Sequence, residues 1–115
     1  MFIAYAVVAV LFSLALFASA RGKLTDDPRT VGMLDPLGVS ATMRKWLAAA
    51  EIAGGLGLLA GIALTPLGVA AAACLVLYFV GAVGSHLRVQ DRNFAPAAVL
   101  GLVAVATLTL RLLSA

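Results

Sequence analysis

Charged residues are scarce in this chain of 115 residues. Only 11% of the residues are Asp, Glu, Lys or Arg, and 63% are hydrophobic; an ordinary soluble domain has roughly 25% charged residues. A water-soluble fold of this length must cover itself with polar groups, and eight basic with five acidic residues are too few to do so. This composition, with a mean hydropathy of +1.12, excludes a soluble enzyme and a disordered tail as first interpretations.

Cysteine and histidine are also nearly missing, with Cys74 and His86 as single copies. One cysteine cannot form an internal disulfide. A single histidine, cysteine and membrane glutamate do not give a metal-ligand set with recognisable spacing, so no metal site is predicted. The net charge of +3 comes without a basic, polar surface, which argues against a nucleic-acid partner. A small integral membrane protein remains, with the lipid bilayer as its surroundings.

Long apolar runs fill most of the sequence. A membrane-spanning helix needs about 20 mostly apolar residues, and the chain offers four such spans at about 2–20, 46–64, 67–85 and 94–111. The predicted fold is therefore all-α, an integral membrane four-helix bundle forming one domain over residues 1–115. A long polar loop, 21–45, separates the first two spans. Asp27 followed by Pro28 is typical of the start of a short interfacial helix, and Ser40 suits the cap of the next helix.

Basic residues are distributed unevenly between the two sides of this predicted bundle. Seven of the eight Lys and Arg residues lie in the loops 21–45 and 86–93, and Arg111 is the remaining one. Because Lys and Arg accumulate in cytoplasmic loops, we expect both loops in the cytoplasm and both termini outside. Arg111, at the end of the last span, is expected to extend to the lipid headgroups.

Small residues recur along two of the spans. Helices in lipid gain little hydrophobic energy by associating, so they use small residues to bring their backbones close. We expect helix packing, and a surface that suits self-association, at Ala53, Gly54, Gly57, Gly61, Gly81 and Ser85.

Glu51 is the one acidic residue inside a predicted span. A carboxylate in hydrocarbon is costly, so it should face the bundle interior, find a partner or be protonated. It also lies five residues after Trp46, about 7.5 Å along a helix, where a structural hydrogen bond near the headgroups fits equally well. His86 ends the third span on the same side, where it could meet Glu51 or cap its own helix. The candidate polar site is Glu51, His86, Arg88, Asp91 and Tyr78.

Four short segments, taken in order, resemble a known family. They are Gly22-Lys23-Leu24, Leu37-Gly38-Val39-Ser40, Glu51-Ile52-Ala53-Gly54-Gly55-Leu56-Gly57-Leu58, and Gly81-Ala82-Val83-Gly84-Ser85-His86-Leu87-Arg88 with Asp91. Their order and spacing are similar to those of the DoxX-like family of small bacterial four-span membrane proteins, close to DoxX and DoxD. The resemblance implies a four-helix bundle in the bacterial inner membrane and carries a family site onto Glu51 and His86. It also implies a link to redox systems, since some relatives are named for a thiosulfate:quinone oxidoreductase and others are linked to thiol and oxidative-stress systems.

Three functions follow as hypotheses. The first is a non-catalytic accessory or scaffold subunit of a membrane redox or stress-response system, bound to a membrane protein partner. The second is a quinone- or lipid-binding oxidoreductase component that uses Glu51 and His86. The third is a small proton-coupled transporter. No cofactor is predicted, a quinone or lipid is the candidate ligand, and an enzymatic activity of the chain alone is left open.

Overall fold

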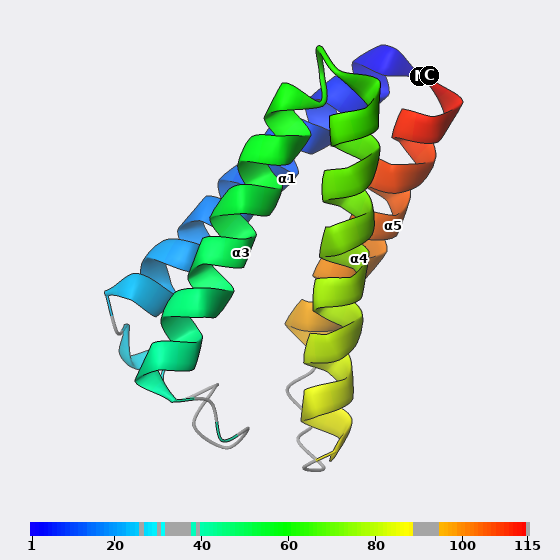
Figure 1. Cartoon of the computed structure of the whole chain (residues 1–115). Helices are drawn as coiled ribbons and strands as arrows, with labels where there is room; N and C mark the ends of the chain where they lie inside the picture. The colour runs from blue at the N-terminus through cyan, green and yellow to red at the C-terminus, as the bar shows by residue number, and fades with distance from the viewer. Residues whose placement is uncertain (26, 30, 32–37, 39, 89–94, 115) are drawn as a thin grey trace.

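The computed structural model describes residues 1–25, 27–29, 31, 38, 40–88 and 95–114, and within them the elements are helices with no strand. The order is α1 (Phe2–Leu24), α3 (Ala41–Ala60), α4 (Thr65–Arg88) and α5 (Ala95–Leu113). Figure 1 shows these four helices running up and down beside one another. The predicted all-α bundle is confirmed.

Three of the helices, α1, α4 and α5, are long and apolar enough to cross a membrane. α3 has 20 residues but carries Arg44, Lys45 and Glu51, which make it the most polar of the four. The chain is therefore a multi-pass membrane protein, and the crossing expected at 46–64 stays a prediction.

The prediction of a long loop over 21–45 is wrong at both ends of the loop, because the flanking helices extend into this range. α1 continues past the apolar run to Leu24. Lys23 stays helical there because its ammonium donates a hydrogen bond of 2.8 Å to the Ser19 hydroxyl one turn earlier. The third predicted span lengthens in the same way, since α4 ends at Arg88.

The predicted caps in this connection fit the structure. The Ser40 hydroxyl accepts a 3.1 Å hydrogen bond from the Met43 amide and so caps α3. The Asp27 carboxylate accepts one of 2.9 Å from the Arg29 amide, as a residue at a helix start does. The rest of the predicted interfacial helix lies mostly outside the described residues.

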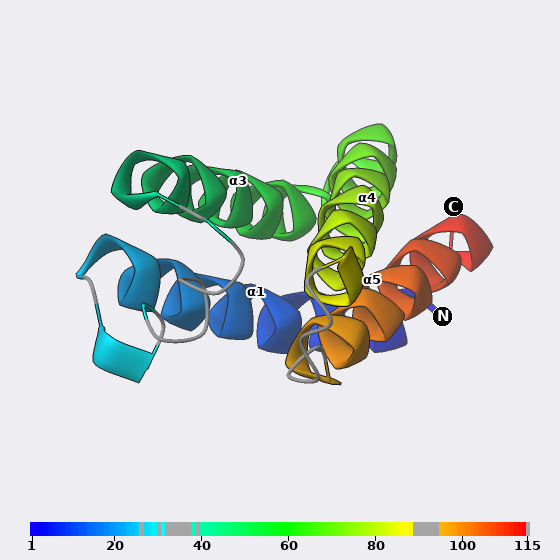
Figure 2. The same cartoon turned by 90° about the horizontal axis from the view of Figure 1, so that it is seen from below.

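The helices form two pairs, α1 with α3 and α4 with α5, which meet at one end and diverge at the other (Figures 1 and 2). α3 and α4 nearly touch at Gly61 and Gly68, where a Cβ atom on Gly61 would collide with the Gly68 backbone. We call this the closed end, defined by Tyr5, Gly61, Gly68 and Arg111. The open end is defined by Lys23, Glu51, Tyr78 and His86.

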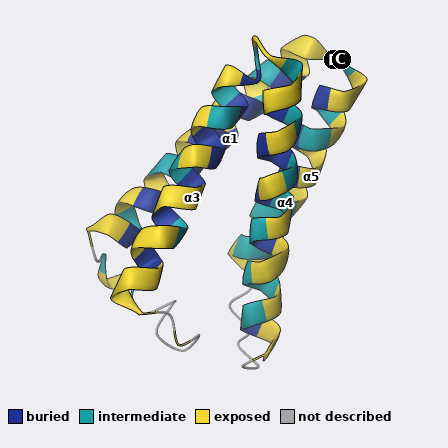
Figure 3. Cartoon of the chain, viewed as in Figure 1, coloured by how far each residue is buried: buried dark blue, intermediate teal, exposed yellow. Residues whose placement is uncertain are grey.

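A narrow core runs between the two pairs. Buried residues on α1 recur at helical spacing as Tyr5, Ala9, Phe12 and Leu16. The Phe12 ring lies against Phe79 of α4, with 6.2 Å between the ring centroids. Figure 3 shows that the outer faces of the helices are mostly exposed, and large apolar residues lie there, as expected for a surface in contact with lipid.

The predicted packing residues divide into two groups. Gly54 and Gly57 face α4 so closely that a Cβ atom would lie 2.6 Å from Leu75 Cδ2 and 2.7 Å from Ala71 Cβ, respectively. With Gly61, they bring α3 onto α4. The others differ from the expectation: Ala53 is exposed, and a Cβ atom at Gly81 would meet nothing within 4 Å. Ser85 hydrogen-bonds the Gly81 carbonyl at 2.9 Å within its own helix.

Arg111 does not extend to the headgroups as predicted but points into the closed end, where it is only 4% exposed. Its guanidinium donates hydrogen bonds to Thr65 Oγ1 at 2.7 Å and to Ser114 Oγ at 3.0 Å. It also lies over the rings of Tyr5 and Phe2, at 5.0 and 5.7 Å from their centroids. Neutral oxygens and aromatic faces therefore surround the charge of Arg111.

Candidate functional site

A cavity of about 690 Å³ opens between the diverging helix pairs at the open end. This volume is in the range of small-molecule sites, which are largely apolar with a few convergent polar groups. Its lining contains both polar side chains and apolar residues such as Leu47, Leu77, Phe79 and Leu100. We call the polar part of the lining the polar wall; it includes Ser19, Lys23, Glu51, Tyr78, Ser85 and His86, together with Ser40 and Arg88.

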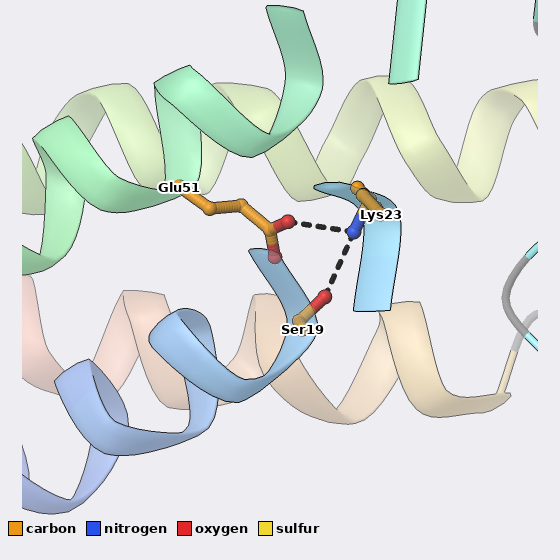
Figure 4. A network of polar contacts seen from close by, with 3 residues as sticks. All are labelled: Ser19, Lys23 and Glu51. Atoms are coloured by element: carbon orange, nitrogen blue, oxygen red, sulfur yellow. Dashed lines mark hydrogen bonds and ion pairs between the residues drawn. The ribbon is translucent and has the colours of Figure 1, made fainter. Parts of the chain in front are cut away.

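The centre of the polar wall is a buried ion pair between α1 and α3. The Lys23 ammonium lies 2.6 Å from the Glu51 carboxylate, which is 1% exposed. The same ammonium donates a hydrogen bond of 2.8 Å to the Ser19 hydroxyl (Figure 4). A charge inside a membrane protein normally faces the interior and is paired. Lys23 and Glu51 meet both conditions.

The register of α1 against α3 brings these two residues together. The Ser13 hydroxyl donates a 3.0 Å hydrogen bond to the Gly55 carbonyl. The Phe17 ring packs on Gly55, where a Cβ atom would lie only 2.6 Å from the ring. Gly55 is one turn after Glu51 on α3, and α1 runs antiparallel to it, so Lys23 arrives at the level of the carboxylate.

Tyr78 extends the site to a third helix. It lies on α4 and its hydroxyl interacts with the Glu51 carboxylate. Its ring meets the ring of Phe79 edge-on, at 4.9 Å between centroids. Glu51 of α3 therefore interacts with side chains of both α1 and α4.

The other predicted site residues lie nearer the mouth of the cavity. His86 is buried and lines the cavity about two turns beyond Tyr78, and Arg88 lines it from an exposed position. Asp91 lies outside the described residues. The cavity thus brings Glu51, Tyr78, His86 and Arg88 together, and Lys23 is the ion-pair partner of Glu51.

Lys23 and Ser19 are the site residues that the sequence reasoning missed. The apolar run ends at Ala20, and Lys23 was therefore assigned to the loop. A signal was present, since Ser19 and Lys23 are four residues apart and share a face if the helix continues. A buried glutamate in a neighbouring span requires a cation, and Lys23 is within reach of it once α1 is extended by one turn.

The arrangement suits an amphipathic molecule that is largely uncharged. Lys23 and Glu51 neutralise one another, so the polar wall offers hydrogen bonds more than net charge. The apolar wall would cover a ring or a hydrocarbon segment. Among the described ranges, no three His, Cys, Asp or Glu residues gather into a group that could hold a metal ion.

Comparison with known proteins agrees with this architecture. The sequence model of the DoxX-like family matches residues 7–108, a range that includes Lys23, Glu51, Tyr78 and His86. No curated protein and no solved structure matches the chain significantly. The matched range contains α3 and α4 entirely and most of α1 and α5. The chain belongs to the DoxX-like family.

Proposed function

We propose that the chain is a non-catalytic accessory subunit that holds a quinone in the open-end cavity for a partner in a membrane redox system. The observation that carries this proposal is a cavity lined by both hydrogen-bond donors and apolar side chains. A quinone head has two carbonyl oxygens on a flat apolar ring, which such a cavity complements. In this proposal the open end, which carries most of the basic residues, faces the cytoplasm across a bacterial inner membrane.

The donors for the quinone oxygens are Lys23 and Tyr78. An ammonium has three N–H groups, and among the described residues Ser19 and Glu51 take two of those of Lys23. The third is available to a ligand. The Tyr78 hydroxyl donates its one hydrogen to the same carboxylate, and on binding it would exchange that bond for one to a quinone oxygen.

The accessory role rests on the chemistry of these side chains. Lysine, tyrosine, glutamate and histidine bind and orient a quinone but do not supply the electrons that reduce it. We therefore assign electron transfer to a partner protein. Proton-coupled transport receives less support, since the carboxylate that would carry the proton is engaged by Lys23 at 2.6 Å.

The test measures binding of duroquinone, a quinone head without a tail, to the purified protein in nanodiscs. One molecule should bind per chain, and Tyr78→Phe should weaken the affinity about five- to tenfold, as expected for one lost hydrogen bond. Tyr5→Phe, a matched change at the closed end, should leave the affinity unchanged. Native mass spectrometry of the protein released from its own membrane should show a bound protein partner.

Two results would contradict the proposal. A folded protein that takes up no duroquinone does not hold quinones. A protein that retains a phospholipid in the cavity and releases it only when Tyr78 is changed is a lipid-binding protein instead.

A further inference from the structure

A second hollow of about 350 Å³ lies on the outer face of the α3–α4 contact. Its wall is almost entirely apolar, and it is lined from α3 by Ala53 and Gly57 and from α4 by Leu67, Ala70 and Cys74. Most of these side chains are exposed on the surface of the bundle, where lipid would lie. We call this hollow the α3–α4 groove.

Tyr78 belongs to both hollows. It lines the open-end cavity and also the end of the α3–α4 groove. Its hydroxyl interacts with Glu51 at the polar wall. One side chain therefore separates a polar, partly enclosed cavity from an apolar trough open to the membrane.

The groove is a trough along the bundle and not a hole through it. Its floor is the close contact between Gly54 and the buried side chain of Leu75. From Leu67 to Tyr78 it follows α4 for eleven residues, about 16 Å at 1.5 Å per residue. This length suits an extended hydrocarbon chain lying along the helices.

We infer that the hydrocarbon tail of the bound molecule leaves the open-end cavity past Tyr78 and lies in the α3–α4 groove. The inference rests on the proposed function and defines its ligand further, as a quinone with a long tail. A tail is favoured over a helix of a second copy because the groove continues from a cavity for a polar head. The tail would then remain in contact with the lipid from which the molecule enters.

Cys74 provides the readout, because it is the single cysteine of the chain and is exposed in the groove. The experiment measures the rate at which N-ethylmaleimide labels Cys74 of the full chain in nanodiscs, followed by mass spectrometry. Decylubiquinone, which has a quinone head and a ten-carbon tail, should slow the labelling at least fivefold. Duroquinone at saturation should leave the rate unchanged.

A substitution in the groove tests the inference independently of the cysteine. Ala70→Trp fills the groove and should reduce decylubiquinone affinity to the level of duroquinone, while duroquinone still binds as before. Ala106→Trp, at an exposed position on α5, is the matched control and should change neither affinity.

The outcomes separate this inference from the proposed function. If duroquinone binds but decylubiquinone does not protect Cys74, the tail path is wrong and the quinone site stands. If neither quinone binds, the proposed function fails. Protection of Cys74 that grows with protein concentration in the absence of quinone would overturn the inference, because a second copy would then cover the groove.

Discussion

Polar side chains are buried at both ends of the bundle, but they connect helices at the closed end and also line a cavity at the open end. At the closed end, the Tyr5 hydroxyl donates to the Leu58 carbonyl at 2.8 Å, and the Arg111 guanidinium is held by Thr65 and Ser114. The Tyr5 bond joins α1 to α3 and the Thr65 bond joins α5 to α4, while Ser114 holds the guanidinium from three residues further along the chain. At the open end, Lys23 and Glu51 also join two helices, but they line a cavity of about 690 Å³.

The difference between the ends arises from backbone spacing rather than from the kind of residue. Both ends bury basic side chains, Arg111 at the closed end and Lys23 with His86 at the open end. At the closed end, Gly61 and Gly68 bring α3 onto α4 with no room between them. Where the helix pairs diverge, similar side chains have space in front of them and line a cavity.

The largest expected effect is at the open end and concerns Lys23. Lys23→Met leaves the Glu51 carboxylate buried and unpaired, which should cost about 3–5 kcal/mol in free energy of unfolding. The measurement is an unfolding titration in mixed detergent micelles. The double variant Lys23→Met/Glu51→Met removes both charges and should recover most of the lost stability.

Lys45→Met is the matched control, since Lys45 is exposed near the same end of the bundle. It should change the unfolding free energy by less than about 0.5 kcal/mol. If Lys23→Met lowers the free energy of unfolding by no more than this control does, the ion pair does not hold α1 to α3.

A smaller loss is expected at the closed end on changing Gly61. Gly61→Ala places a methyl group against the Gly68 backbone and should cost about 1–3 kcal/mol, seen as a lower melting temperature. Gly81→Ala is the control, because a Cβ atom there meets nothing within 4 Å. Equal melting temperatures for the two variants would show that the close approach of α3 and α4 does not determine stability.

The smallest effect is expected from Tyr5→Phe. The change removes the hydrogen bond to the Leu58 carbonyl and should lower the unfolding free energy by about 1 kcal/mol. Duroquinone affinity should stay at its original value, because the lost hydrogen bond is at the closed end and the proposed quinone site is at the open end. A clear change in affinity would mean that the two ends are coupled.

The fold could be predicted from the sequence because it depends on local properties. Apolar runs and their spacing locate the helices. Glu51 stands out because a carboxylate in hydrocarbon is costly and must face the bundle interior or find a partner. The glycines of α3 likewise predicted a close helix contact. These signals depend on neighbouring residues along one helix.

The rest of the site depends on how one helix lies against another. Lys23 is 28 residues from Glu51 in sequence, and it meets the carboxylate only because Ser13 and Phe17 fix α1 against Gly55. The apolar run ends at Ala20, so hydropathy does not predict the helical turn that carries Lys23. Arg111 was placed outward for a related reason, since no local pattern shows that Thr65 and Tyr5 are beside it.

The divergence of the helix pairs gives the protein unequal cross-sections in the two leaflets of a bilayer. The leaflet around the closed end surrounds a narrow bundle, and the other surrounds a wide one. Lateral pressure at the depth of the wide end acts directly on the separation of the two pairs. We therefore expect lipid composition to change the width of the cavity without altering any residue that lines it.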